Sequence, residues 1–298
     1  MFSLPEHRTT WAAYAFLMLL VTIIAFENLT THDFWDGWDD WDIAADLAIM
    51  ADNPAHMISS QKFFEEVRPP VDLVLLAGYL IWQDNPVGFH ILHIGLHLMA
   101  SLLLAYTLRR HGLDLELSFL SGLLFLINTA HFRALHWITI TNYVLALIFS
   151  LMLLIFYTRF LDTQKKSNLA LSILLLALAI FSHPSAVSIT PFCIYLTWRR
   201  TNRVGQTLFA SLPLALATPI LIFLAFTASP GAPQNEGAFV VPDLLRLPKN
   251  LFWYLGRLIT TACWITRGTV SNQAYPLEIV LGVVAVVATL ILYRSQIF

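Results

Sequence analysis

Long apolar stretches separated by short polar turns dominate the chain. A membrane-spanning helix needs about 20 apolar residues, or fewer where protein covers its ends. On this criterion the pattern predicts eight transmembrane helices, at residues 11–26, 86–108, 113–130, 138–156, 168–181, 185–198, 206–227 and 279–293. The apolar run at residues 71–82 is too short to cross and contains Asp72, so we expect an interfacial or re-entrant helix there.

Two longer polar regions interrupt this pattern. Residues 27–85 form the first predicted outer loop, which contains the interfacial helix at 71–82. Residues 229–275 form the second, and the aromatic-rich run 251–265 within it also suits an interfacial helix. Asn85-Pro86 predicts a helix start, because proline is favoured in a first helical turn. The expected fold class is therefore an all-α polytopic membrane protein whose residues 1–298 form a single membrane domain.

Composition agrees with a membrane protein. The chain is 57% hydrophobic and 12% charged, whereas soluble domains carry roughly a quarter charged residues. The two cysteines make neither a disulfide framework nor a metal motif. The basic residues form no stripe beyond clusters at predicted span ends, so we expect no nucleic-acid partner. A transporter is disfavoured, because no inverted repeat or pair of matching broken helices is present.

The charges predict an orientation. Alternating spans place ten of the 17 basic residues but only four of the 19 acidic residues on one side. Short cytoplasmic loops of membrane proteins are enriched in lysine and arginine. We therefore expect both termini to be cytoplasmic and the first loop to lie on the outer side.

An acidic and aromatic stretch lies in that first loop. Residues 33–42, DFWDGWDDWD, contain five carboxylates and three tryptophans. One interpretation is a solvated loop whose tryptophans rest at the membrane interface, where amphipathic rings prefer to lie. The other is a site of chemistry, since the rest of the chain consists mostly of hydrophobic helices.

Histidines and arginines converge on the same predicted side. His90, His93 and His97 share one helix face, while His131, Arg133 and His136 lie in one turn and His183 in another. Hydrogen-bonded packing histidines are the ordinary interpretation of the first group. A metal or haem site is an alternative, because imidazole binds iron, copper and zinc. Arg133 has the alternative of anchoring a span end at the lipid headgroups.

These residue types suit the transfer of a sugar from a lipid-phosphate carrier to a hydroxyl. The acceptor hydroxyl needs a carboxylate base within hydrogen-bonding reach, and the leaving phosphate needs cationic or donor groups. Aromatic walls suit a sugar ring. The argument shows compatibility, since other chemistries use similar residues.

The order of motifs adds a resemblance. Asp39-Asp40, Arg68-Pro69-Pro70 and the segment NPVGFHILHIGLH at residues 85–97 resemble the front half of the GT-C integral membrane glycosyltransferases. They are most similar to bacterial relatives of the transmembrane, tetratricopeptide-containing O-mannosyltransferases. Residues 128–139, NTAHFRALHWIT, are similar to the aromatic and histidine-rich turn of that family.

The resemblance implies an enzyme that uses a polyprenyl-phosphate-linked sugar at the non-cytoplasmic face, in a bacterial inner membrane. It implies Asp40 as catalytic base, with Asp39 as second choice. The donor phosphate would be bound by Arg68, Arg133 and His90. The substrate pocket would include Trp38, Trp41, His93, His136 and His183. Besides this donor, membrane lipids and protein partners in a membrane complex are expected.

The chain also departs from this family. Ser182-His183-Pro184 stands where relatives have a Ser-Lys-Glu type signature, and no repeat of about 34 residues occurs. The alternatives are a non-catalytic membrane subunit that scaffolds a larger complex, and a membrane protein that binds a cofactor through its histidines. No metal ligands are assigned, although an aspartate cluster can hold a hard divalent cation.

Overall fold

The computed structural model describes residues 8–31, 33–34, 39–58, 67–128, 135 and 137–228, together with residues 280, 283, 284 and 287. Every regular element within these residues is a helix. The chain divides into two compact units, Met1–Ile127 with Arg133–Ala232, and Asn128–Phe132 with Pro233–Phe298. The helices below all belong to the first unit.

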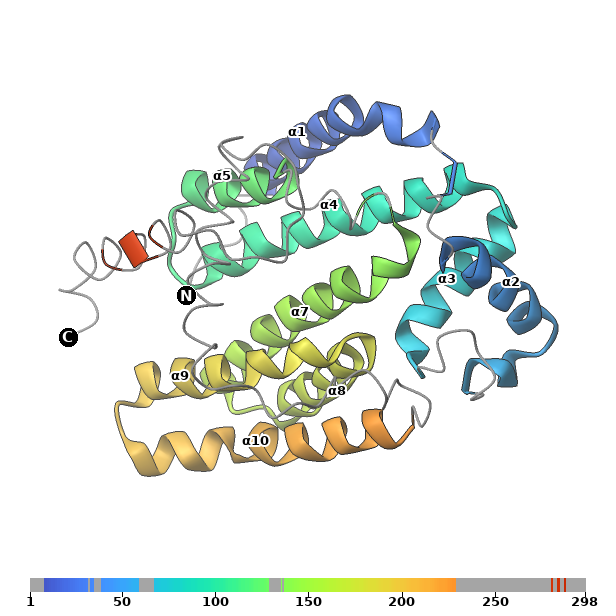
Figure 1. Ribbon diagram of the computed structural model, residues 1–298. Coiled ribbons are helices and arrows are strands. Elements are labelled where there is room, and N and C mark those ends of the chain that lie inside the picture. The colour runs from blue at the N-terminus through green and yellow to red at the C-terminus, as the bar shows by residue number, and fades with distance from the viewer. Residues whose placement is uncertain are drawn as a thin grey trace. The chain divides into compact units, whose positions relative to one another are not determined.

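Helices follow one another with short connections. In chain order they are α1 (Arg8–Phe26), η1 (Glu27–Thr31), α2 (Asp39–Asp52), η2 (Pro54–Ile58), α3 (Pro69–Trp82), α4 (Pro86–Arg110), α5 (Leu115–Leu126), η4 (Ile138–Ile140), α7 (Thr141–Thr163), α8 (Lys166–Ser182), η5 (Pro184–Ser188), α9 (Ile189–Thr201) and α10 (Val204–Thr227) (Figure 1).

Local sequence explains several of these boundaries. The Asn85 side chain accepts a hydrogen bond from the amide of Val87 at 3.0 Å, and Pro86 follows as the first helical residue of α4. This confirms the helix start expected at Asn85-Pro86. At the other end of two helices, Gln164 after α7 and Asn202 after α9 adopt positive φ values of 55° and 49°. Left-handed residues of this kind close helices and reverse the chain tightly.

Among the described residues, four helices are long and apolar enough to cross a membrane: Thr9–Phe26, Pro86–Arg110, Thr141–Thr163 and Val204–Ala225. They correspond to the first, second, fourth and seventh predicted spans. The apolar helices Leu115–Leu126 and Lys166–Ser182 are shorter than this limit, as is α9. Pro69–Trp82 is also short, in agreement with the prediction that this segment does not cross. The predicted second outer loop lies outside the described residues, and so does most of the span at 279–293.

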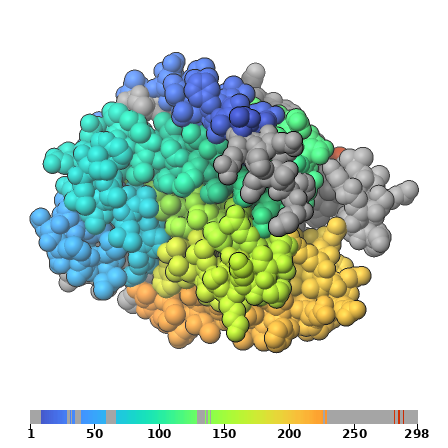
Figure 2. Space-filling model, turned by 180° about the vertical axis from the view of Figure 1, so that it is seen from behind, coloured from blue at the N-terminus to red at the C-terminus, as the bar shows by residue number. Residues whose placement is uncertain are grey.

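The helices alternate in direction, so their ends gather at two opposite sides (Figure 1). We call one side the basic end; it contains the C-termini of α4, α7 and α9 and the turns that follow them. We call the other side the acidic end; it contains α2, α3, the N-terminal parts of α4 and α7, and the C-terminus of α8. From behind, α1 lies along one edge of this unit, and α9 and α10 along the opposite edge (Figure 2).

Two apolar clusters hold the unit together, and α7 contributes to both. The first cluster joins α2, α3, α4 and α7, and the second joins α7, α8, α9 and α10. The first cluster also explains a helix that was not expected, because residues 39–52 of the predicted outer loop form the helix α2. Ala44, Leu47 and Met50 are buried on one face of that helix. Their burial stabilises a helix despite the acidic residues around them.

Candidate functional site

Asp40, the expected base, lies in the first turn of α2 and is 1% exposed. The N-terminus of a helix stabilises a negative charge, because the unpaired amide groups and the positive end of the helix dipole are located there. The helix packs against α3 and η4, and α3 packs in turn against α4 and α8. The element that carries Asp40 is therefore in direct contact with the element that follows Arg68.

Arg68 and His183 are brought close together although they are far apart in sequence. Arg68 precedes α3, and His183 lies between α8 and η5. Burial and, to a smaller extent, the nearby positive charge of Arg68 together lower the pKa of His183 from 6.5 to about 4. The imidazole of His183 is therefore neutral, and the positive charge of this pair of residues resides on the guanidinium of Arg68.

The His183 ring is held by its neighbours. It lies against the Tyr143 ring, with 4.0 Å between ring centroids. Its Nδ1 accepts a hydrogen bond from the Ser185 amide at 3.2 Å and lies 2.7 Å from the Ser185 hydroxyl. In a neutral ring the proton then resides on Nε2. His183 thus has a fixed tautomer as well as a fixed position.

His90 is buried at the start of α4. Its Nε2 lies 3.3 Å from the carbonyl oxygen of Asp33. A carbonyl can only accept, so Nε2 carries the proton and Nδ1 of the neutral ring is an acceptor. This Nδ1 is buried and has no hydrogen-bond partner within the part of the chain that the structure describes. Buried polar atoms are usually satisfied, so an atom of this kind is a candidate ligand contact.

His93 and His97 bind other helices instead. The Thr141 hydroxyl donates to the Ile138 carbonyl at 2.7 Å, so it accepts its second hydrogen bond from Nε2 of His93. His97 donates through Nε2 to the Leu126 carbonyl at 3.0 Å. These two histidines connect α4 to α7 and to α5. Their bonds match the ordinary interpretation of packing histidines.

The aromatic residues near α2 are partly described. Trp41 is exposed and meets Phe34 edge to face, with 4.9 Å between ring centroids. Phe34 is buried and also contacts Phe89 on α4, at 5.8 Å. Phe34 is therefore packed on the start of α4, and the preceding Asp33 contacts His90 through its carbonyl oxygen. Trp41 itself remains accessible to a ligand.

Several predicted site residues lie outside the described part of the chain: Trp38, Arg133, His136 and the side chain of Asp39. Of the others, the elements that carry Asp40, Arg68, His90, His93 and His183 all meet at the acidic end (Figure 1). Sequence reasoning missed Thr141 and Tyr143, the partners of His93 and His183. Both residues lie at the start of α7, and the histidine-rich turn that precedes them in the sequence was the signal that indicated this region.

The arrangement offers a buried carboxylate, a guanidinium, and imidazoles of defined tautomer. Among the described residues no group of three His, Cys, Asp or Glu side chains is placed to hold a metal ion. The Nε2 atoms of His90, His93 and His97 bind three different partners, so these rings do not converge on one point. The chemistry available here is acid-base catalysis with anion binding.

Comparison of the chain with family models, with curated proteins and with solved structures found no match.

Proposed function

We propose that this protein transfers a sugar from a polyprenyl-phosphate-linked donor to an acceptor hydroxyl. The observation that carries the proposal is the burial of Asp40 at the N-terminus of α2, on the same packed end as Arg68 and His90. The resemblance of residues 30–200 to GT-C glycosyltransferases supports the same function.

In the proposed reaction the acceptor oxygen forms a bond to the anomeric carbon of the sugar. The bond from that carbon to the carrier phosphate oxygen breaks, and the electron pair leaves with the lipid phosphate. Asp40 takes the proton of the acceptor hydroxyl as general base. Arg68 stabilises the departing phosphate, because a guanidinium matches phosphate geometry and keeps its charge.

His90 has a narrower part in this scheme. Its Nδ1 accepts in the neutral ring and donates only in the protonated ring. An incoming hydroxyl or a protonated phosphate oxygen can donate to the neutral ring, whereas an ionised phosphate oxygen requires the imidazolium. His93 and His97 keep a positioning role, since their Nε2 atoms are already bonded.

The proposal includes a membrane arrangement. Eight spans would place the basic end in the cytoplasm with both termini, and the acidic end on the outer face of a bacterial inner membrane. The ion pairs that join Arg110 and Arg200 to Asp162 bring the C-terminal ends of α4, α7 and α9 together, which supports this arrangement. This asymmetry agrees with the enrichment of basic residues in cytoplasmic loops.

The test is turnover by purified protein in liposomes supplied with radiolabelled polyprenyl-phosphate monosaccharides. We expect transfer or hydrolysis by the wild type, reduced about 10²–10⁴-fold in Asp40→Asn, because general-base catalysis contributes a factor of that size. Asp52→Asn is the matched control, since it removes an exposed carboxylate from the other end of the same helix. It should retain activity.

Equal turnover by wild type and Asp40→Asn would exclude Asp40 as the base and move the search to Asp39. No turnover with any donor, by folded protein that co-purifies with a partner, would contradict the enzyme proposal. That outcome favours the scaffold subunit instead.

A further inference from the structure

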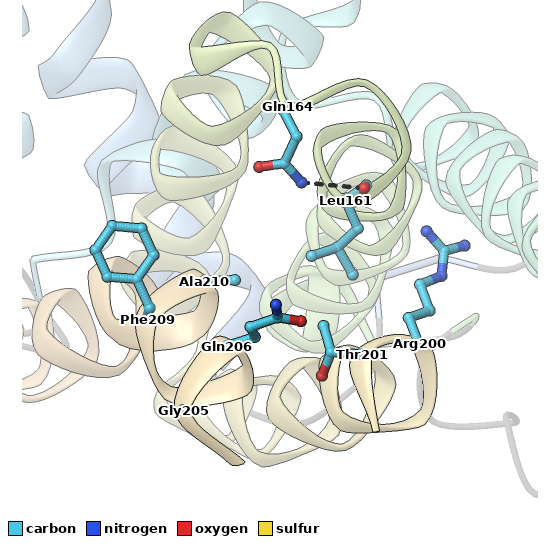
Figure 3. A pocket seen from close by; sticks show the side chains of 8 residues that line it. All are labelled: Leu161, Gln164, Arg200, Thr201, Gly205, Gln206, Phe209 and Ala210. Carbon is cyan, nitrogen blue, oxygen red and sulfur yellow. Dashed lines mark hydrogen bonds between the residues drawn. The ribbon is translucent and has the colours of Figure 1, made fainter. Parts of the chain in front are cut away.

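A second possible binding site lies at the basic end, away from the proposed sugar-transfer site. A cavity of about 470 Å³ opens between the α7–α8 turn and the α9–α10 turn (Figure 3). Its lining includes Gln164, Arg200, Thr201, Gln206 and Phe209. The lining therefore combines a cation and neutral polar groups with an aromatic ring.

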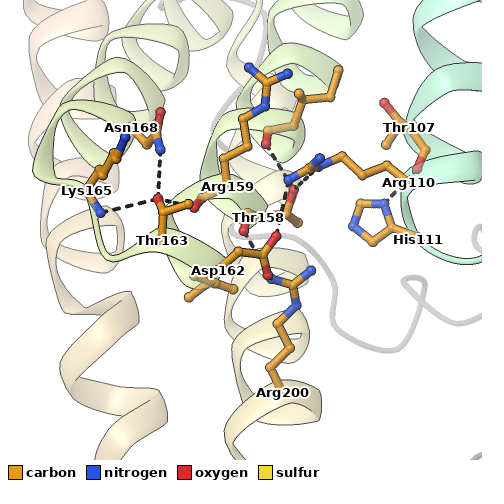
Figure 4. Close-up of polar contacts among 12 residues, drawn as sticks. Thr107, Arg110, His111, Thr158, Arg159, Asp162, Thr163, Lys165, Asn168 and Arg200 are labelled. Atoms are coloured by element: carbon orange, nitrogen blue, oxygen red, sulfur yellow. Dashed lines mark hydrogen bonds and ion pairs between the residues drawn. The ribbon is translucent and has the colours of Figure 1, made fainter. Parts of the chain in front are cut away.

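The cation in this cavity has unused hydrogen-bonding capacity. Arg200 contacts Asp162 and the Thr158 carbonyl, and both bonds come from the same nitrogen, Nη1 (Figure 4). No hydrogen bond within the described residues uses Nη2 or Nε of Arg200. The Arg200 side chain is 35% exposed and lines the cavity.

The charge on Arg200 is also incompletely neutralised. Arg110 binds the same Asp162 carboxylate, through Nη2 at 3.2 Å, and donates from Nε to Thr158 at 2.9 Å. Two guanidinium groups thus share one carboxylate, and the cluster keeps a net positive charge (Figure 4). Four further basic residues are exposed at this end: Lys165, Lys166, Arg199 and Arg203. The ligand favoured by this potential is an anion.

An apolar strip leads away from the cavity. Phe209 lines the cavity and is 82% exposed. Leu212, Leu216, Ile220 and Phe223 follow on α10 at helical spacing and are exposed as well. A small soluble anion makes no use of such a strip, whereas an acyl chain buries against it. The combined surface suits a molecule with an anionic head and an apolar tail.

We propose that this cavity binds the phosphate headgroup of an anionic phospholipid, with one acyl chain along the exposed face of α10. Arg200 donates from Nη2 and Nε to the phosphate oxygens, a geometry that guanidinium groups favour. The amide of Gln206 lies at the cavity rim and can bond the polar part of the headgroup. Basic pockets between helices at a cytoplasmic face are suited to such lipids.

The experiment is a titration of the full-length protein in detergent with dioleoylphosphatidylglycerol or dioleoylphosphatidylcholine, followed by native mass spectrometry. Two variants act on the cavity in different ways. Arg200→Gln removes the cation. Gly205→Phe fills the cavity mouth without changing charge, and a Cβ at Gly205 meets nothing within 4 Å. Arg199→Gln is the matched control, because it removes a neighbouring exposed charge that does not line the cavity.

We expect the wild type to prefer phosphatidylglycerol over phosphatidylcholine. Arg200→Gln should weaken phosphatidylglycerol binding about fivefold, the factor expected for a basic residue near an anionic headgroup. Gly205→Phe should weaken the same binding because its ring occupies the cavity. Arg199→Gln should change it less than about twofold. Monodisperse elution of each variant checks folding, and Gly205→Phe decides the question if Arg200→Gln does not fold.

Two results would overturn the proposal. Equal weakening by Arg199→Gln and Arg200→Gln, with no effect of Gly205→Phe, would indicate diffuse surface charge instead of a site. Displacement of the lipid by inorganic phosphate at equal concentration would show that the cavity takes free phosphate. Both readouts are independent of sugar transfer, so this proposal and the proposed enzyme can fail separately.

Discussion

At the acidic end Asp40, His90 and His93 are almost fully buried, whereas at the basic end the Asp162 side chain is 50% exposed and the Arg200 side chain 35% exposed. At the acidic end, polar side chains are held by separate hydrogen bonds, such as the bond from His93 to Thr141. The basic end shares its groups in a network around Asp162. A buried polar group that loses its partner destabilises the fold by its full desolvation free energy, whereas an exposed polar group can form hydrogen bonds with water instead. Substitutions should therefore cost more at the acidic end.

The largest contrast is expected from two glycines. In Gly88→Ala the new Cβ would lie 2.2 Å from Cγ of Trp82, where the last residue of α3 meets the first turn of α4 at the acidic end. We expect a loss of about 1–3 kcal/mol of stability, because the backbone must shift. Gly205→Ala at the basic end meets open space and should stay within about 1 kcal/mol of wild type. Denaturant titration in detergent micelles measures both.

The second contrast concerns hydroxyl groups. Thr141→Val removes the acceptor of His93 and leaves a buried donor, so we expect a loss of about 1–2 kcal/mol. Thr163→Val removes an exposed hydroxyl from the α7–α8 turn and should cost less than about 0.5 kcal/mol. The same titration compares them. Equal losses would mean that burial does not distinguish the two ends.

A smaller effect is expected for Asp162→Asn. This change removes the carboxylate shared by Arg110 and Arg200, and each exposed ion pair contributes about 0–1 kcal/mol. The loss should shrink as salt is added, since salt screens exposed charges. Unfolding at low and high ionic strength is the measurement. A loss that is large and independent of salt would show that this network acts as a buried one.

The smallest effect is a pH dependence at the acidic end. The pKa of His183 is lowered to about 4 in the folded protein, mainly by burial and then by Arg68, so the unfolded chain binds the proton more readily. The stabilisation is complete above pH 6.5 and is lost as pH falls toward 4. The thermal unfolding temperature should therefore fall less steeply between pH 7 and pH 4 in His183→Gln than in the wild type. Arg68→Gln should also flatten the profile, and an unchanged slope in both would contradict the assignment.

Several features of the fold could be predicted from the sequence. The helix start at Asn85-Pro86 was expected and is confirmed, because capping depends on neighbouring residues alone. The shared face of His90, His93 and His97 was also expected, and all three residues are buried. The helix α2 was not expected, because the acidic residues of its first turn obscured the apolar spacing of Ala44, Leu47 and Met50.

The site itself depends on contacts between distant segments. No local pattern shows that His183 lies near Arg68, or that Thr141 accepts the bond of His93. Likewise, the charge pattern of the sequence predicted a basic side of the protein but did not indicate that the guanidiniums of Arg110 and Arg200 share the carboxylate of Asp162. Such partners are chosen by helix packing, which fixes distances between residues that are unrelated in sequence.

By itself the sequence determined the helical class, the membrane-like composition and the separation of basic from acidic ends, since these follow from periodicity and charge along the chain. The tertiary structure alone decided which polar atoms are satisfied and which are left available, such as Nδ1 of His90 and Nη2 of Arg200. The reason is physical: hydrogen bonding and desolvation act over a few ångströms in space, whatever the distance along the chain.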